Sequence, residues 1–367
     1  MMTIAVETLR TWLEEGRPVT VLDVRPAVER AEWAIPGSIH VNAYEALKAH
    51  DPAALAEVDV PSDGPVVTVC AAGKTSLIAA EQLAARGIEA LSLEGGMKAW
   101  SLAWNAAEVP IPASSVRVIQ VRRTGKGCLS YLIGAGKQVA VIDASLDPQV
   151  YLDLAAQHGW QITRVLETHI HADHLSRSRQ LAERSGARLI LPDQQRVTFP
   201  FTAIHDGERL PPETMQLTAL RTPGHTPEST CYLLEGQVLF TGDTLFPTGV
   251  GRPDLDASPQ EAQARARALY HSLHKLLALS AETLVLAGHS SAPIPFDGVP
   301  IMASLREIDE QVGILHATRD DFVRILLSRL PAAPPNYTQI VRLNERGLLP
   351  EQPVTELEAG ANRCAIS

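Results

Sequence analysis

The sequence predicts an α/β protein of two domains, and three observations support this fold class. The chain has 367 residues, enough for two domains that each bury a hydrophobic core. Apolar runs typical of buried parallel strands alternate with segments whose apolar residues recur at helical spacing. A stretch rich in alanine, proline and serine, "SLAWNAAEVPIPASS", separates two such blocks. We therefore expect domains at residues 1–105 and 116–367, joined by a linker at residues 106–115.

The first block is expected to form a small domain around a parallel sheet. Its first residues, "MMTIAVETLRTWLEEGRP", predict a short strand and then an amphipathic helix. The runs "VTVLDV" and "PVVTVC" predict buried strands, and "SLIAAEQLAARG" predicts a helix that ends at a glycine.

The second block predicts two strand hairpins, a series of alternating helices and strands, and a helical tail. One hairpin joins "CLSYLIG" to "QVAVIDAS", and the other covers "TCYLLEGQVLFTGD". A long helix follows at "SPQEAQARARALYHSLHKLLAL". In the tail, "SLREIDEQVGIL" and "RDDFVRILLSRL" are helical by period, and the prolines of "PAAPPNY" end this run. The tail could form walls of a substrate pocket or the contact of a homo-oligomer, and the sequence leaves both open.

Charge and cysteine usage limit the classes of partner and compartment. The net charge of −10 disfavours nucleic acid, which needs a basic protein face, and also disfavours docking on anionic membranes. No apolar run reaches the length of a membrane span, and the first residues lack the pattern of a signal peptide. The four cysteines show no paired spacing. We therefore expect a cytoplasmic protein with reduced thiols, and neither nucleic acid nor membrane among its partners.

The stretch "VVTVCAAGKTS" permits two interpretations, a phosphate-binding loop or a reactive cysteine. A P-loop needs glycine five residues before the Gly-Lys pair, but Thr68 stands there inside an apolar run. What remains is a strand, then Cys70, a short loop that contains glycine, and a helix that begins near Thr75. Backbone N–H groups of the loop, the helix N-terminus and Lys74 would stabilise a thiolate or persulfide sulfur. This stretch alone is equally compatible with a buried structural cysteine.

The neighbouring motifs "VLDVRPAVERAEWAIPGSIHV", "CAAGKT" and "LSLEGGMKAW" resemble the rhodanese (sulfurtransferase) family across about residues 5–105. The resemblance implies that Cys70 carries sulfane sulfur as a persulfide, and that Asp23 and Arg25 belong to the scaffold. Many relatives place arginine inside the loop, whereas two alanines follow the cysteine here. Recognition of an anionic donor such as thiosulfate would therefore depend on Lys74 and on backbone amides.

The stretch "ETHIHADHL" is the strongest metal-binding signal in the sequence. His169 and His171 are two residues apart at the end of a predicted strand, so their side chains point to the same side. We expect Asp173 and His174 on the first turn of the following helix, where they can face the same place. Clustered imidazoles with a carboxylate suit a divalent transition metal. Further candidates at strand-to-loop junctions are His225 in "TPGHTPES", Asp243 in "LFTGDTLF" and His289 in "VLAGHSS".

Across about residues 115–300 this pattern resembles the metallo-β-lactamase fold superfamily, which implies an αββα sandwich. The resemblance leaves two chemistries open. All seven positions could hold a dinuclear zinc site, as in thioesterases of the glyoxalase II type. Alternatively, two histidines and one carboxylate could hold one iron, as in persulfide dioxygenases of the ethylmalonic-encephalopathy protein type.

Three features favour the dioxygenase group. The stretches "TGDTLFPTGVGRPDL" and "EAGANRCAI" resemble that group, and a persulfide-making domain suits a persulfide-consuming one on the same chain. Two serines follow His289 where glutathione-using relatives commonly have an acidic residue and a tyrosine, which leaves the thiol carrier open. We expect Cys128 and Cys231 to be core residues, and Cys364 either to approach the site or to be a buried structural thiol.

Carried over residue by residue, this resemblance implies one Fe(II) per chain on His169, His225 and Asp243. The remaining positions would orient these ligands, bind water or hold a second metal: His171, Asp173, His174 and His289. Arg252 would be the cation nearest the substrate, or else part of a structural salt bridge.

The resulting hypothesis is an iron-dependent oxidation of a low-molecular-weight thiol persulfide, such as glutathione persulfide, by O2 to sulfite and thiol. Cys70 would exchange sulfane sulfur between thiosulfate and persulfide, so thiosulfate and sulfite join persulfide and O2 as partners. The main alternative is a dinuclear zinc hydrolase of the glyoxalase II type with an accessory rhodanese domain. A non-enzymatic sulfur relay with a structural metal site is a further alternative.

Overall fold

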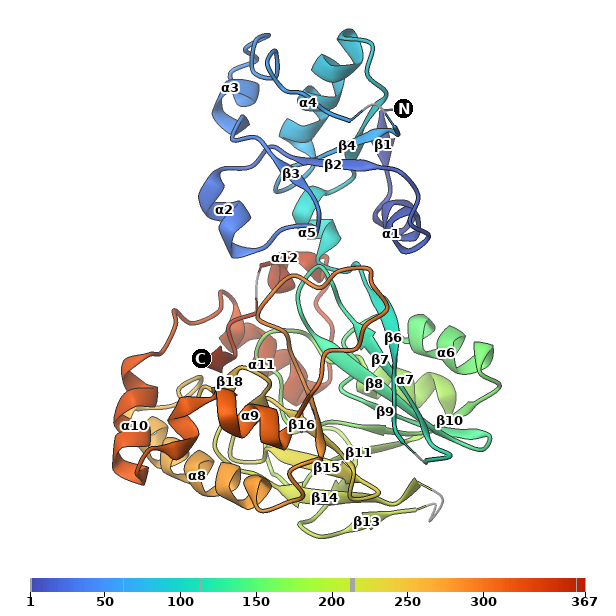
Figure 1. Ribbon diagram of the computed structural model, residues 1–367. Coiled ribbons are helices and arrows are strands. Elements are labelled where there is room, and N and C mark those ends of the chain that lie inside the picture. Colours follow the sequence, from blue (N-terminus) through green and yellow to red (C-terminus); the bar gives the residue numbers. More distant parts are fainter. Residues whose placement is uncertain (1, 62, 113, 212–214, 361, 367) are drawn as a thin grey trace.

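The computed structural model describes residues 2–61, 63–112, 114–211, 215–360 and 362–366. An N-terminal domain with one five-stranded sheet lies against a larger domain that contains two sheets with helices outside them (Figure 1). This arrangement confirms the predicted α/β class, with a small parallel-sheet domain before an αββα sandwich. Within the described part of the chain, no helix combines the length and hydrophobicity that a membrane crossing requires.

The N-terminal sheet has the strand order β1-β5-β4-β2-β3, and all its neighbouring strands are parallel. Its elements are β1 (Thr3–Ile4), α1 (Val6–Glu14), β2 (Thr20–Asp23), α2 (Ala27–Glu32), β3 (Ile39–His40), α3 (Tyr44–Lys48), β4 (Val66–Val69), α4 (Lys74–Ala85), β5 (Ala90–Leu93) and α5 (Gly96–Trp100). Strands β2 and β4 are buried along their whole length because helices cover both faces of the sheet. The carboxyl end of β4 therefore places Cys70 at the edge of a rigid core.

The first sheet of the larger domain has seven strands in the order β12-β11-β10-β9-β8-β7-β6. These are β6 (Asn105–Val109), β7 (Arg117–Arg122), β8 (Leu129–Ala135), β9 (Gln138–Ile142), β10 (Gln161–Leu166), β11 (Arg188–Pro192) and β12 (Thr202–Ile204). The predicted hairpin of β8 and β9 is present. Strand β6 pairs antiparallel with β7, so residues 106–109 of the expected linker belong to this sheet.

The second sheet has six strands in the order β13-β14-β15-β16-β19-β20. These are β13 (Arg209–Leu210), β14 (Leu217–Arg221), β15 (Thr230–Leu234), β16 (Val238–Gly242), β19 (Leu284–Ala287) and β20 (Ala303–Ser304). Strands β15 and β16 form the second predicted hairpin. A small third sheet joins β17 (Leu245–Phe246), β18 (Gly249–Gly251) and β21 (Ala365–Ile366), which brings the C-terminal strand beside the segment that follows Asp243.

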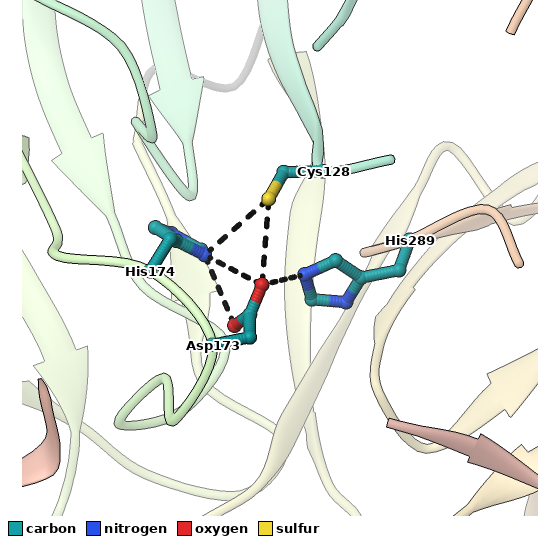
Figure 2. Close-up of side chains that lie close together, drawn as sticks. All are labelled: Cys128, Asp173, His174 and His289. Atoms are coloured by element: carbon teal, nitrogen blue, oxygen red, sulfur yellow. Dashed lines mark hydrogen bonds and ion pairs between the residues drawn. The ribbon is translucent and has the colours of Figure 1, made fainter. Parts of the chain in front are cut away.

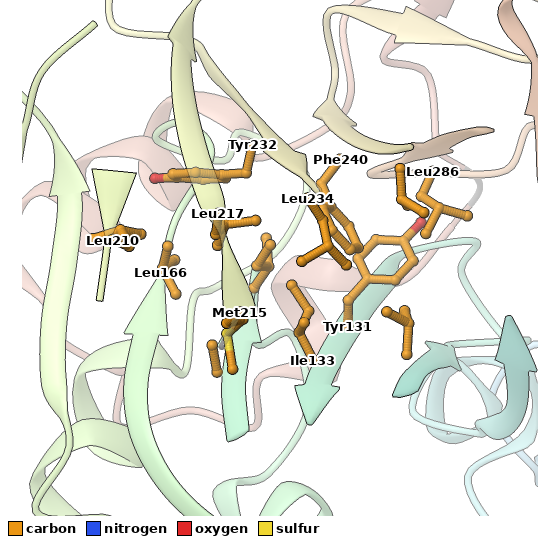
Figure 3. Close-up of a cluster of buried hydrophobic side chains, with 14 of the residues drawn as sticks. Tyr131, Ile133, Leu166, Leu210, Met215, Leu217, Tyr232, Leu234, Phe240 and Leu286 are labelled. Carbon is orange, nitrogen blue, oxygen red and sulfur yellow. The ribbon is translucent and has the colours of Figure 1, made fainter. Parts of the chain in front are cut away.

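Apolar side chains from the facing sides of the two large sheets form the central core (Figure 3). Tyr131 on β8 meets Phe240 on β16 edge to face, with ring centroids 5.0 Å apart. Helices α6 (Pro148–Gln157) and α7 (Ser178–Ser185) pack on the outer side of the first sheet. Helix α8 (Pro259–Leu277) packs on the outer side of the second sheet.

The tail contains the two predicted helices, α9 (Leu305–Gln311) and α10 (Arg319–Ser328), with a 3-10 turn at Gly313–His316 between them. Both helices add apolar side chains to the core beside α8. Two helices that the sequence reasoning did not predict follow the prolines, α11 (Tyr337–Arg346) and α12 (Thr355–Glu358). Helix α12 lies next to α5 at the boundary between the domains (Figure 1).

Candidate metal centre and sulfur loop

Cys70 lies directly after β4 in a loop that leads into α4. Its side chain is 2 % exposed, and its Sγ accepts hydrogen bonds from Gly73 N at 3.2 Å and Ser76 Oγ at 3.3 Å. These donors suit a sulfur atom that carries negative charge. Lys74, the predicted anion-binding residue, is exposed at the first position of α4.

A second glycine-rich segment holds the Cys70 loop in place. Met97 N donates to Cys70 O at 2.8 Å, and Lys98 N donates to Ala71 O at 3.0 Å. Gly96 has a φ of 56°, and a Cβ at this position would lie 2.2 Å from Cys70 O. Glycine is therefore required for the close approach of the two segments. The motif "LEGGMKAW" acts as the support of the cysteine loop.

His169, His225 and Asp243 converge in the larger domain, as predicted. Each follows a different strand, β10, β14 and β16, and each is at most 3 % exposed. Asp243 Oδ2 lies 3.8 Å from His169 Nε2 and 3.6 Å from His225 Nε2. Among the described residues, neither His169 Nε2 nor Asp243 Oδ2 has a hydrogen-bond partner. Two buried polar atoms that face each other without a partner fit the ligands of a metal ion.

Hydrogen bonds on the far side of each ring fix the orientation of both histidines. His225 Nδ1 donates to Arg252 O at 2.8 Å, which leaves the lone pair of Nε2 to face Asp243. His169 Nδ1 lies 2.9 Å from Thr168 Oγ1, and Thr168 Oγ1 donates to Asp143 Oδ2 at 2.7 Å. The sequence reasoning missed Thr168 and Asp143, although Thr168 lies inside "ETHIHADHL".

The protonation states of this set suit metal binding. Burial, the largest effect, lowers the pKa of His169 and of His225, so both imidazoles are neutral at pH 7. For Asp243, burial raises the pKa, but His289, His169 and His225 together lower it below its ordinary value. The set therefore offers two neutral nitrogens and one carboxylate, the donors that divalent transition metals prefer.

His171 lies beside this set but its Nε2 faces two other carboxylates. Nε2 donates to Glu167 Oε2 at 2.9 Å and lies 3.3 Å from Asp143 Oδ1. Burial lowers the pKa of His171, but the charges and hydrogen bonds of Asp143 and Glu167 raise it well above its ordinary value. Sequence reasoning grouped His171 with the other site histidines and missed the buried Glu167, which is the first residue of "ETHIHADHL".

Cys128, expected in the core, is part of a second cluster with Asp173, His174 and His289 (Figure 2). Asp173 and His174 lie in the loop between β10 and α7, so their expected position on a helix was wrong. Its Sγ lies 3.4 Å from Asp173 Oδ2 and 3.8 Å from His174 Nδ1. Burial, the largest effect, and Asp173 raise the pKa of this thiol, but His174 and His289 lower it to about 6. Cys128 is buried, as expected, but it contacts polar side chains rather than the apolar core, because it lies between β7 and β8 at the polar end of the sandwich. Cys231, by contrast, packs in the apolar core.

Arg252 occupies a structural position. Its guanidinium is 1 % exposed, donates to both carboxylate oxygens of Asp254 at 2.8 Å, and also donates to the backbone carbonyl groups of Pro331, Ala332 and Arg363. Arg252 therefore forms a structural salt bridge, the second of the two roles expected for it.

Cys364 lies near the histidine site. Its carbonyl oxygen accepts a hydrogen bond from Arg252 N at 3.1 Å, and its Sγ lies within 4.8 Å of ligand atoms of Asp243 and His289. Cys364 therefore both approaches the site and is buried.

Polar contacts hold the two domains together. Trp33 Nε1 donates to Thr124 O at 3.0 Å, and Arg123 Nε donates to Ser101 O at 2.6 Å. A cavity of about 250 Å³ lies at this boundary. Its lining includes Ala71 of the cysteine loop, and Gly125 and Gly360 of the larger domain.

Comparisons with known proteins assign both parts of the chain. Residues 123–289 match the family described as Metallo-beta-lactamase superfamily, and residues 5–103 match the Rhodanese-like domain. A hydroxyacylglutathione hydrolase from Pseudomonas aeruginosa is 33% identical over 181 residues, which cover 48% of this chain and 67% of that protein. One from Rhizobium johnstonii is 36% identical over 153 residues, 41% of this chain and 56% of that protein. The chain thus spans little more than half the length of several of these relatives.

Two solved structures resemble a large part of this chain. A metallo-beta-lactamase from Staphylococcus aureus subsp. aureus COL has a TM-score of 0.59 and 27% identity, covering 65% of this chain and 75% of that one. ETHE1 from Myxococcus xanthus has a TM-score of 0.51 and 29% identity, covering 66% of this chain and 98% of that one. Together with the geometry of the histidine site, these similarities show that the chain belongs to the metallo-beta-lactamase superfamily and carries an N-terminal rhodanese-like domain.

Proposed function

We propose that the larger domain oxidises a low-molecular-weight thiol persulfide with O2, and that one Fe(II) per chain is held by His169, His225 and Asp243. The reaction is RSSH + O2 + H2O → RSH + H2SO3, in which the terminal sulfur is oxidised and O2 is reduced. The observation that carries this proposal is the position of His171. Its Nε2 is held by Glu167 and Asp143, and a separate group of ligand atoms that all lie within 4.8 Å of one another comes from His169, His225 and Asp243. This donor set is the one used by non-haem iron oxygenases.

The residues of the chain prepare this site in three ways. Thr168 and the carbonyl of Arg252 orient the two imidazoles, and burial keeps both of them neutral. Burial of all three ligand side chains excludes bulk water, which limits competing hydrolysis. An iron ion bound there supplies the redox chemistry that the reaction of a persulfide with O2 requires. The similarity to ETHE1 and the resemblance of the segment after Asp243 to the dioxygenase group support the same assignment.

We also propose that Cys70 exchanges sulfane sulfur between thiosulfate and a thiol, giving sulfite and the persulfide that the larger domain consumes. The N–H of Gly73 and the hydroxyl of Ser76 would stabilise the sulfur, and exposed Lys74 would attract an anionic donor. The cavity between the domains supports a coupled function, because the cysteine loop and the larger domain share its walls.

A zinc hydrolase of the glyoxalase II type is the second candidate. The observation that favours it is the identity of 33% to 36% with proteins named hydroxyacylglutathione hydrolase, across 41% to 48% of this chain. In that case, the substrate would be a thioester of glutathione and the rhodanese-like domain would be accessory.

Oxygen consumption distinguishes the two functions. The full chain, loaded with Fe(II) under anaerobic conditions, is mixed with glutathione persulfide while O2 and sulfite are measured. We expect one sulfite formed per O2 consumed, and no consumption by the same chain loaded with zinc or by the Asp243→Ala variant loaded with iron. Absence of O2 uptake with every small thiol persulfide, together with hydrolysis of a hydroxyacylglutathione by the zinc-loaded chain, would support the hydrolase instead.

A further inference from the structure

The cavity between the domains has walls from both of them. On the N-terminal side its lining includes Ala71 of the cysteine loop and Lys98 of α5. The larger domain closes the cavity with Gly125 and with the chain that ends at Gly360. A water molecule occupies about 30 Å³, so a cavity of about 250 Å³ admits a small anion together with several waters. The larger domain therefore completes a pocket at the cysteine loop.

Lys98 is the cation of this pocket that can exchange its partner. Among the described residues that line the pocket, the cations are Arg25 and Lys98. The guanidinium of Arg25 is 5 % exposed and donates to both carboxylate oxygens of Asp23 and to Trp33 O. These bonds commit Arg25 to the scaffold of the N-terminal domain. The side chain of Lys98, in contrast, is 42 % exposed and pairs with Glu356 of the larger domain at 2.7 Å.

The backbone holds Lys98 against the cysteine loop. Lys98 N donates to the carbonyl oxygen of Ala71, the residue after Cys70, at 3.0 Å. Lys74 begins α4 and is not among the described residues that line the pocket. Its charge can raise the concentration of anions near the domain, but an ammonium group that contacts an anion inside the pocket comes from Lys98.

Acidic side chains disfavour an anion in the part of the pocket formed by α2. Glu29 and Glu32 of this helix belong to the lining. The carboxylate of Glu32 lies 3.2 Å from the guanidinium of Arg363, so the C-terminal segment is tied to α2 as well as to α5. Since like charges repel, an anion is directed to the part of the pocket where Lys98 lies beside the cysteine loop.

We propose that Lys98 binds the anionic group of a sulfur donor of the thiosulfate class, and that Glu356 occupies Lys98 when no donor is bound. This inference rests on the proposed sulfur transfer at Cys70 and names the residue that binds its donor. In that transfer the Cys70 thiolate forms a bond to the outer sulfur of thiosulfate, the S–S bond of thiosulfate breaks, and sulfite leaves with the electron pair. Oxygen atoms carry negative charge in both the donor and the leaving sulfite, and an ammonium group stabilises them. Binding of the donor thus depends on a carboxylate that the other domain supplies.

Thiosulfate binding to the full chain with Cys70→Ser tests this assignment without turnover. Calorimetric titration at low ionic strength gives the Kd for Cys70→Ser alone and with each second substitution. We expect Lys98→Gln to weaken binding about 10-fold, because a hydrogen bond from a charged donor is lost. We expect Glu356→Gln to tighten binding about 3-fold, because the competing carboxylate of a surface pair is removed. Lys48→Gln removes an exposed charge of the same domain outside the pocket and should leave the Kd unchanged.

Equal affinity in Lys98→Gln and Lys48→Gln, or loss of binding in Lys74→Gln instead, would overturn the assignment. Weaker binding in Glu356→Gln would equally overturn it, because a competing carboxylate must tighten binding when it is removed. Reduced glutathione is titrated in the same way, and a dependence on Lys98 for glutathione alone would assign this lysine to the thiol acceptor instead.

Sulfur transfer is measured separately, on chains that retain Cys70. Absence of transfer from thiosulfate in the wild type would refute the proposed function of the N-terminal domain. Binding of thiosulfate that depends on Lys98 would still support the anion site, so the two failures are distinguishable.

Discussion

Replacing Glu358 by glutamine should destabilise the larger domain substantially. The carboxylate of Glu358 and the guanidinium of Arg123 are both 0 % exposed and lie 2.6 Å apart. Glu358 also lies 3.2 Å from Arg177 and accepts from Leu175 N at 2.8 Å. Glutamine keeps the volume but removes the carboxylate that forms ion pairs with both buried guanidinium groups.

Removal of one partner of a buried ion pair costs about 3–5 kcal/mol. We expect the lower end, about 3 kcal/mol, because Ser101 O and Ser145 O still accept hydrogen bonds from Arg123. For a domain of this size, that loss corresponds to a decrease in Tm of about 6–12 °C. Scanning calorimetry of the full chain, with and without metal, measures the decrease.

Glu356→Gln is the matched control for this experiment. Glu356 lies two residues away and pairs with Lys98 at 2.7 Å, but its side chain is 51 % exposed and that of Lys98 is 42 % exposed. A surface pair of this kind contributes about 0–1 kcal/mol. If Glu358→Gln lowers the Tm no more than Glu356→Gln, the reasoning about the buried pair is refuted.

The stabilisation by the Glu358–Arg123 ion pair should depend on pH. Burial raises the pKa of Glu358, but Arg123 and Arg177 lower it below its ordinary value of 4.5. A carboxyl group whose pKa is lower in the folded state stabilises the fold above its unfolded pKa, and this contribution is lost as the pH falls through the folded pKa. The difference in Tm between wild type and Glu358→Gln should therefore be full at pH 7 and shrink below about pH 4.5. A difference that grows on acidification would contradict this sign.

Three further predictions concern the two sites. Thr168→Val removes the hydroxyl that orients His169, so metal affinity should fall about 10–100-fold in competition with a chelator; unchanged affinity would contradict the orienting role. Gly96→Ala places a methyl group 2.2 Å from Cys70 O and should lower sulfur transfer from thiosulfate about 10²-fold, whereas Gly16→Ala, with a similar φ of +64° and no atom within 4 Å, should not. Cys70→Ser should abolish sulfur transfer while metal content stays at the wild-type value, and residual transfer would place the sulfur carrier elsewhere.

Much of the fold was predictable because its signals are local. The apolar runs of β2 and β4, the hairpin of β8 and β9, and the helical period of α8 each depend on residues close together in the sequence. The boundary between the domains was less predictable. Residues 106–109 resemble a linker in composition, but they pair with β7, a contact that composition does not encode.

From the sequence by itself, motif spacing and the ends of strands indicated seven candidate ligand positions and the place of Cys70 after a buried strand. The choice of His169, His225 and Asp243 among the seven came from the resemblance to the dioxygenase group. Only the tertiary structure decided that His171 faces Glu167 and Asp143, that Arg252 binds Asp254 and the tail, and that Cys128 joins a polar cluster. Cys128 and Asp173 are 45 residues apart, since Cys128 directly precedes β8 and Asp173 follows β10. Contacts between distant segments depend on how the two sheets pack, and no local pattern of residues specifies that packing.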